Sequence, residues 1–249
     1  MDFSETVLVL QVGQFRESDL WVRFLSPSRG LLTAFAFGGS RSRRRFAGCL
    51  DIFNEVNVSV GSSLRVPYLA LREGVLVRGL SRLRRDWRRF GVAVNCARFL
   101  QSFGVQPEGA AKAYFLLRET VSALEEPERP ASRLLPLFFR ARLSFDQGYA
   151  LSLTRCFHCG RELSGVPCRL LTREGRVACC ACAGFFQDNR LSLGPEALSA
   201  LRHLHVLPPA DWHGLALPPA AEREFSLAVD AFVRYHVGIF WKDGRFVRH

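Results

Sequence analysis

The chain has 249 residues, of which 48% are hydrophobic and 12% aromatic, and its formal net charge is +11 at neutral pH. This composition supplies enough apolar surface for one large or two modest globular domains. The sequence lacks an apolar run of about eighteen residues and the basic and apolar segments of a secretory signal, which predicts a cytoplasmic protein. The excess of positive charge favours a polyanionic partner.

Residues 5–77 alternate short apolar runs with turn residues, and no helical period is sustained there. The runs are Thr6–Val12, Leu20–Leu25, Leu31–Phe37, Phe53–Val60 and Val66–Leu71. They predict five strands, separated mainly by glycine and proline. A short all-β unit must protect its edges, so we expect a small closed barrel, with a small sandwich as the alternative.

After Arg78 the apolar residues recur at spacings of three and four, which is typical of helices. The helical segments lie around Trp87, Tyr114, Leu134, Leu198 and Phe225. We therefore predict an α+β protein with a β-domain over residues 1–80 and an all-helical domain over residues 81–249. A cysteine-rich segment at about residues 154–190 is inserted in the helical domain.

Six of the eight cysteines lie between residues 156 and 182. Two C-x-x-C knuckles, separated by nineteen residues, are formed by Cys156 with Cys159 and by Cys179 with Cys182. Each knuckle presents two thiolates from a tight turn, and together they predict a closed shell for one structural Zn²⁺ ion. Cys180 and His158 are alternative ligands. A closed four-sulfur shell has no position for a reacting water, which argues against zinc catalysis.

A first group of arginines follows two glycines in the loop between the third and fourth expected strands. It consists of Arg41, Arg43, Arg44 and Arg45. Such a loop can follow a phosphate backbone, while Phe35, Phe37 and Phe46 nearby can stack on bases. The alternative is a solvated turn.

A second group of arginines spans the expected domain boundary. It consists of Arg78, Arg82, Arg84, Arg85, Arg88 and Arg89. A helix that begins near Arg84 places the last four on one side and turns Trp87 inward. This side would extend the positive surface for further phosphate contacts, although charged helix faces also serve solubility alone.

Catalytic motifs are missing from the sequence. It contains no Walker-type glycine loop, no G-x-S-x-G and no H-x-E pattern of the zinc deaminases. We therefore expect no catalytic residues and no small-molecule substrate. Two rival classes are a zinc-ribbon RNA-binding or transcription-associated factor with the same barrel, and a nuclease, which would need an open metal site.

The order of the motifs resembles the RecO family of bacterial recombination mediators almost from end to end. The matching segments are Val7–Leu10, Glu17–Asp19, Leu31–Gly39 with Arg41–Arg45, Leu50–Phe53, Phe139–Leu143, Gly148–Tyr149 and Cys156–Gly160. The sequence departs from the family pattern at Leu151, where proline is common, and in its adjacent Cys179 and Cys180. The second departure is the reason that the ligand set stays open.

The resemblance implies an N-terminal OB-fold barrel and a helical domain with a zinc finger. It also implies a protein of the cytoplasm and nucleoid that binds single-stranded and double-stranded DNA, anneals complementary strands and binds RecR. With RecR it would help to load RecA onto DNA coated by single-strand binding protein (SSB), and a contact with RecF is left open. The SSB tail is acidic and apolar, so it calls for arginines beside an apolar groove. Arg118, Arg133 and Arg140, near Leu134 and Phe138, are the candidates.

Overall fold

The computed structural model describes the chain except residues 1, 64–65, 127, 129–131, 187–189 and 249. The chain forms two compact units, residues 1–90 with 104–127 and residues 91–103 with 128–249. Domains of residues 1–80 and 81–249 are expected from the sequence, whereas here residues 81–90 and 104–127 belong to the unit that contains the barrel.

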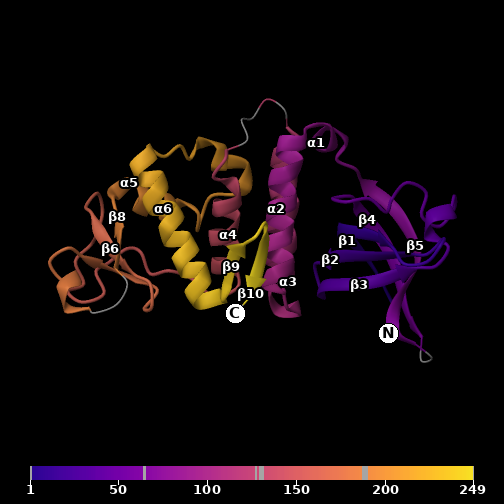
Figure 1. Cartoon of the computed structure of the whole chain (residues 1–249), viewed down its shortest axis with the longest axis horizontal. Helices are drawn as coiled ribbons and strands as arrows, with labels where there is room; N and C mark the ends of the chain where they lie inside the picture. The colour runs from indigo at the N-terminus through magenta and orange to yellow at the C-terminus, as the bar shows by residue number, and fades with distance from the viewer. Residues whose placement is uncertain (1, 64–65, 127, 129–131, 187–189, 249) are drawn as a thin grey trace. The chain divides into compact units, whose positions relative to one another are not determined.

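The first unit is built around a closed five-stranded barrel (Figure 1). Its strands are β1 (Phe3–Gln14), β2 (Leu20–Ser26), β3 (Gly30–Ala36), β4 (Glu55–Ser63) and β5 (Val66–Arg78). The strand order is β1-β2-β3-β5-β4, and β4 pairs with β1 to close the barrel. All neighbours are antiparallel except β3 and β5, which are parallel. The prediction of a closed, OB-fold-like barrel is confirmed, and the sandwich alternative is wrong.

The barrel core follows from the two-residue period of the strands. Alternate residues of β1 and β4 point inward, such as Val7 and Val9 on β1 and Val56 and Val58 on β4, all at most 1% exposed. Phe24 on β2 belongs to the same core and is fully buried. Because every strand has two neighbours, this small unit leaves no long edge unpaired.

Three helices follow the barrel in the sequence: α1 (Ser81–Arg85), α2 (Trp87–Phe103) and α3 (Pro107–Glu125). α3 packs on β2 and β3. Gly30 lies at this contact with φ of 75°, and a Cβ built there would be 2.5 Å from the carbonyl oxygen of Val105. The turn between β2 and β3 therefore requires glycine, both for its left-handed backbone and for the close approach of the segment before α3.

The second unit contains α4 (Leu135–Asp146), α5 (Pro195–His203) and α6 (Pro219–Phe232), followed by a π-helical turn (Val233–Val237). Phe138 on α4 makes edge-to-face contacts with Phe225 on α6 and with Trp212, and these rings form the centre of the helical core. Each of the three helices starts with proline at its first turn, where the missing N–H costs no hydrogen bond. Short 3₁₀ turns cover Gly39–Arg41, Ala183–Phe185 and Pro209–Gly214.

Two small sheets complete the second unit. The cysteine-rich module has a three-stranded sheet of β6 (Cys168–Leu171), β7 (Arg176–Cys179) and β8 (Arg190–Leu193). β9 (Ile239–Lys242) and β10 (Arg245–Arg248) form a hairpin near the C-terminus. This hairpin was not predicted, although Asp243 and Gly244, both with positive φ, are a strong signal for a two-residue turn. Among the described helices, none is long and apolar enough to cross a membrane.

Candidate metal centre and nucleic-acid interface

The four cysteines of the two knuckles converge on one point. Their Sγ atoms all lie within 4.8 Å of one another. The group consists of Cys156, Cys159, Cys179 and Cys182. The Sγ atoms of Cys159 and Cys179 are 3.9 Å apart. A tetrahedral zinc site with Zn–S bonds of about 2.3 Å requires sulfur atoms about 3.8 Å apart, so this arrangement fits one ion.

The local backbone explains why the knuckles meet. Cys156 accepts a backbone hydrogen bond from Gly160 at 3.0 Å, and the positive φ of Gly160 closes the first turn. Cys179 ends β7 and accepts a backbone hydrogen bond from Cys182 at 3.0 Å, which closes the second turn. Arg202 on α5 donates to the carbonyl oxygen of Leu153 from Nε and Nη2, and so ties the start of the module to the helical unit.

Hydrogen bonds favour thiolate at one of the four positions. Burial raises the pKa of the Cys156 thiol, but backbone N–H donors of Cys159, Cys179 and His158 outweigh burial and lower the pKa to about 6. The Cys179 donor is 3.3 Å from the sulfur. A lowered pKa suits a metal ligand, because the thiolate is the form that binds zinc.

The other candidate ligands lie outside this group. Cys180 is exposed and its Sγ lies 3.5 Å from the carbonyl oxygen of Pro167. The ring of His158 stacks on Phe185 at 4.9 Å. Burial raises the pKa of the Cys168 thiol to about 12, which is typical of a protonated core thiol. All eight cysteines are free of disulfides. The geometry therefore favours the two C-x-x-C pairs as the set of residues that could hold a metal ion.

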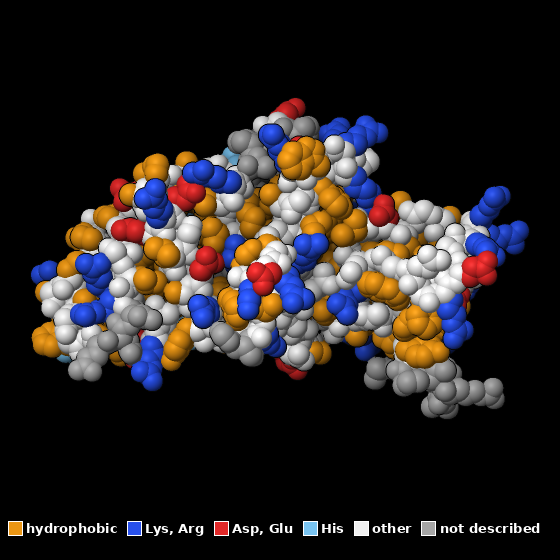
Figure 2. Space-filling model, in the orientation of Figure 1, with side chains coloured by type: hydrophobic (Ala, Val, Ile, Leu, Met, Phe, Trp, Pro, Cys, Tyr) orange, Lys and Arg blue, Asp and Glu red, His pale blue; other side chains and the backbone are white. Residues whose placement is uncertain are grey.

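The arginine loop after β3 divides into side chains with protein partners and side chains directed to solvent. Arg41 forms an exposed ion pair with Glu17 at 3.0 Å. Arg45 donates from Nη2 to the carbonyl oxygen of Phe37 at 2.5 Å. Arg43 and Arg44 are exposed and form no ion pair with any described residue. Figure 2 shows Lys and Arg side chains projecting from the barrel unit at the right of the view.

An aromatic cluster lies on the barrel beside this loop. Phe35 contacts Phe15 at 4.7 Å, Phe37 at 6.5 Å and Tyr68 at 5.0 Å between ring centroids. Phe15 and Phe37 are 45% and 36% exposed. The expectation that Phe46 offers its ring to bases is wrong. A backbone hydrogen bond from Gly74 on β5 to Arg45 anchors the loop, and Phe46 is buried in the barrel core.

The expectation that four boundary arginines share one helical side is also wrong. Asp86 is extended, so α1 ends at Arg85 and α2 begins anew at Trp87. The side chain of Trp87 is 76% exposed rather than turned inward, and Arg88 lies 5.2 Å above its ring. This break separates Arg85 on α1 from Arg88 on α2. The four arginines therefore do not share one helix face.

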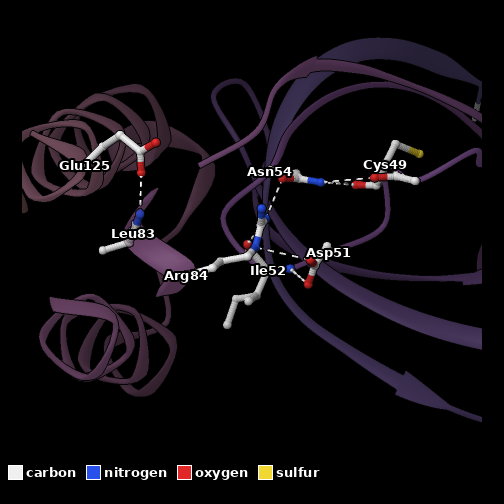
Figure 3. A network of polar contacts seen from close by, with 8 residues as sticks. Cys49, Asp51, Ile52, Asn54, Leu83, Arg84 and Glu125 are labelled. Atoms are coloured by element: carbon white, nitrogen blue, oxygen red, sulfur yellow. Dashed lines mark hydrogen bonds and ion pairs between the residues drawn. The ribbon is translucent and has the colours of Figure 1, made fainter. Parts of the chain in front are cut away.

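Arg84 is a structural residue (Figure 3). Its Nη2 donates to the carbonyl oxygen of Ile52 at 2.7 Å and to Oδ1 of Asn54 at 2.5 Å. Its Nε lies 3.2 Å from a carboxylate oxygen of Asp51. Asn54 continues the network by donating to the carbonyl oxygen of Cys49 at 2.9 Å. The guanidinium thus links α1 to the loop before β4 through contacts with protein groups.

Arg89 has a similar role. Its Nη1 donates to the carbonyl oxygens of Leu124 at 3.1 Å and Glu126 at 2.7 Å, at the end of α3. Its Nε is 3.2 Å from Asp86, and the side chain is only 13% exposed. Of the boundary group, the exposed members are Arg82, Arg85 and Arg88.

The three arginines expected to hold an acidic tail are divided between the two units. Arg118 lies in the first unit, where its Nε is 2.9 Å from buried Glu55. Arg133 and Arg140 lie in the second unit and pair with Glu222 and Asp230 on α6. The expected apolar neighbours are wrong as well. Phe138 is fully buried in the helical core and Leu134 is 6% exposed, so neither lines a groove.

Arg140 instead borders a cavity of about 920 Å³ within the second unit. The cavity is lined by aromatic and apolar side chains that include Phe240, Trp241 and Leu227. Arg234 adds a second guanidinium, 5.2 Å above the ring of Phe240. Sequence reasoning missed this cavity because its walls come from segments far apart in the chain, which include α2, α4, α6, the cysteine-rich module and the unpredicted hairpin.

The chain is a two-unit α+β protein. One unit has an OB-fold-like barrel with exposed arginines, and the other is helical and carries a tetracysteine module. Family models extend this description. The model for the recombination protein O N terminal matches residues 1–78, and the model for the recombination protein O C terminal matches residues 84–245. The chain belongs to the RecO family of DNA repair and recombination proteins.

Individual relatives agree with the family models. The DNA repair protein RecO of Oleidesulfovibrio alaskensis is 50% identical over 249 residues, which cover the whole of both chains. That of Nitratidesulfovibrio vulgaris is 46% identical over 252 residues, again covering both chains. That of Anaeromyxobacter sp. is 32% identical over 234 residues, which cover 94% of this chain and 91% of the relative.

Proposed function

We propose that this protein binds single-stranded and double-stranded DNA, anneals complementary strands and, with RecR, helps to load RecA onto SSB-coated DNA at the nucleoid. The observation that carries the DNA-binding part is the barrel surface, where exposed Arg43 and Arg44 lie in the loop that follows the aromatic strand β3. Phe15 and Phe37 offer partly exposed rings on the same barrel. Membership of a DNA repair family supports this choice of polyanion.

Annealing requires no chemical step, because two strands that repel each other need only be held together while their bases pair. Guanidinium groups neutralise phosphates and release condensed counterions, which makes the affinity fall steeply with salt. Exposed rings hold bases by stacking and tolerate any sequence. The protein therefore acts in our proposal as a non-enzymatic scaffold, and its contacts with RecR, RecF and RecA are predictions from the family.

One Zn²⁺ ion would be held by Cys156, Cys159, Cys179 and Cys182. Bound zinc supplies folding energy and no reaction, since four thiolates complete its coordination. The chain's own residues then determine what the module presents to a partner.

The first experiment mixes the purified protein with two complementary labelled oligonucleotides, each coated with SSB, and follows duplex formation at increasing salt. We expect rapid annealing that slows steeply as salt rises. Absence of acceleration, or cleavage of the labelled strands with magnesium, would contradict the proposal. A marked preference for RNA over DNA of the same sequence would instead favour the zinc-ribbon RNA-binding class.

For the SSB tail, we propose the cavity beside Arg140. The tail presents carboxylates next to an aromatic side chain, and the cavity combines Arg140 and Arg234 with the rings of Phe240 and Trp241. Nη1 of Arg140 forms an ion pair with Oδ1 of Asp230 at 2.8 Å. A tail carboxylate would therefore compete with Asp230 for the guanidinium.

Arg140→Ala is expected to weaken the binding of a tail peptide by about tenfold or more, because an aromatic pocket without its cation leaves the peptide carboxylate unpaired. Fluorescence anisotropy of a labelled peptide measures this change. Arg133→Ala is the matched control, since Arg133 pairs with α6 through Glu222 and does not line the cavity. Equal affinity of the Arg140→Ala variant and the unaltered protein would remove the assignment.

A further inference from the structure

The surface of the cysteine-rich module carries aromatic side chains that the barrel site does not use. Phe157 and His158 lie within the first C-x-x-C knuckle, and Phe185 and Phe186 lie just after the second. The two segments are about 30 residues apart in the sequence, and the converging cysteines bring them side by side. The position of these rings therefore depends directly on the metal-binding set.

The rings form one continuous row. Phe185 stacks on His158 at 4.9 Å, and His158 meets Phe186 edge to face at 6.3 Å. Phe186 stacks on Phe157 at 5.8 Å with an interplanar angle of 27°. The guanidinium carbon of Arg176 lies 4.5 Å above the ring of Phe157 and ends the row. These contacts hold the rings at defined angles on the surface of the module.

The row is exposed to solvent although it is apolar. The side chain of Phe185 is 71% exposed and that of Phe157 is 39% exposed. The backbone fixes both ends, because Phe157 donates its N–H to Val177 on β7 at 2.8 Å, and Phe185 donates to Cys182 at 3.1 Å. The fold thus holds apolar rings in contact with water. Such a surface favours a partner that has planar apolar faces.

The charge around the row suits a polyanion. Residues 154–190 contain six arginines and three acidic residues. Zinc with four thiolates carries two negative charges, so the module keeps a positive balance even when the metal is bound. Arg155, Arg161 and Arg176 are exposed and lie on the segments that flank the knuckles. Phosphates can therefore be neutralised where bases would stack.

We propose that Phe157, His158, Phe185 and Phe186, with Arg176, form a second binding site for single-stranded DNA. The proposal rests on the DNA-binding function proposed above and adds to it a site separate from the barrel. Single strands are favoured because their bases expose both faces, whereas the bases inside a duplex are covered by their neighbours. One chain would then hold DNA strands at two places, which suits a protein that pairs two strands.

The test uses the full-length, zinc-loaded protein and a labelled oligothymidylate. Phe157→Ala with Phe185→Ala is expected to weaken single-strand affinity by about tenfold or more, since each base stacked on an aromatic side chain contributes substantially. Affinity for a blunt duplex and the zinc content should not change. Phe115→Ala is the matched control, because Phe115 is 50% exposed on α3 and far from the row in the sequence.

A second measurement locates the strand directly. Photocrosslinking with iodouracil-substituted single strands, followed by mass spectrometry, should yield adducts on the segments that contain Phe157 and Phe185. Phe185→Trp should keep the affinity, because the larger ring preserves stacking. The Phe185→Ala single variant gives an independent result if the double variant loses zinc.

The outcomes separate the two proposals. If the unaltered protein binds single strands but neither the double variant nor the Phe185→Ala variant weakens binding, and no adduct forms in the module, the second site is wrong and the barrel site stands. If the unaltered protein binds no DNA, both proposals fail. If the variants lose RecR binding and keep DNA binding, the row is a protein interface and our inference is overturned.

Discussion

Replacing Cys156 and Cys182 with serine is expected to abolish zinc binding and to lower the melting temperature by roughly 10 °C. A metal at a thousandfold excess over its dissociation constant stabilises the folded state by about 4 kcal/mol, and for a chain of this length each kcal/mol corresponds to about 2–4 °C. The metal joins two knuckles that are far apart in the sequence. Removing one ligand from each knuckle therefore removes the link between them. Zinc analysis and thermal unfolding measure both effects.

Cys180→Ser is the matched control for this experiment. Cys180 is next to a ligand in the sequence but is exposed, and its Sγ faces the carbonyl oxygen of Pro167 instead of the ligand group. This variant should keep one zinc ion and the original melting temperature. Zinc that persists in the double variant, or that leaves the Cys180→Ser variant, would contradict the ligand assignment.

Reversing the charge at Arg43 and Arg44 should reduce single-strand affinity by about tenfold or more at moderate salt. The slope of the logarithm of affinity against the logarithm of salt should fall by about 1.4, because two phosphate contacts on a single strand are lost. Both side chains are exposed, so Arg43→Glu with Arg44→Glu should leave the melting temperature unchanged. A titration at several salt concentrations measures the affinity and the slope together.

Adding Arg45→Glu to this variant should abolish most of the remaining binding, but it also removes the hydrogen bond to Phe37 and so changes the loop. The double variant is therefore the cleaner test. Arg98→Glu with Arg223→Glu is the control, since it makes the same change in net charge at exposed positions of the helical segments. Unchanged affinity and slope in the Arg43 and Arg44 variant would remove the loop from the DNA site.

The difference between Arg84 and Arg85 shows why sequence alone could not assign the DNA contacts. The two residues are adjacent and chemically identical, and both fit a basic helix end. Arg84 is bound by partners about 30 residues away in the loop before β4, while Arg85 is exposed. The same uncertainty applied to Phe46, which lies close to the exposed Phe37 in sequence but is buried in the barrel.

The sequence by itself determined the five strands, the helical segments and the four cysteines, because each depends on a local period or a local spacing. Inward residues of a strand alternate, helix faces repeat at three and four, and each C-x-x-C pair forms its own turn. Only the tertiary structure decided that the strands close through a parallel pairing of β3 and β5 and that α3 belongs with the barrel. It also decided which arginines are held by the fold and which face solvent. These features depend on contacts between residues far apart in the chain, and residue spacing carries no record of such contacts.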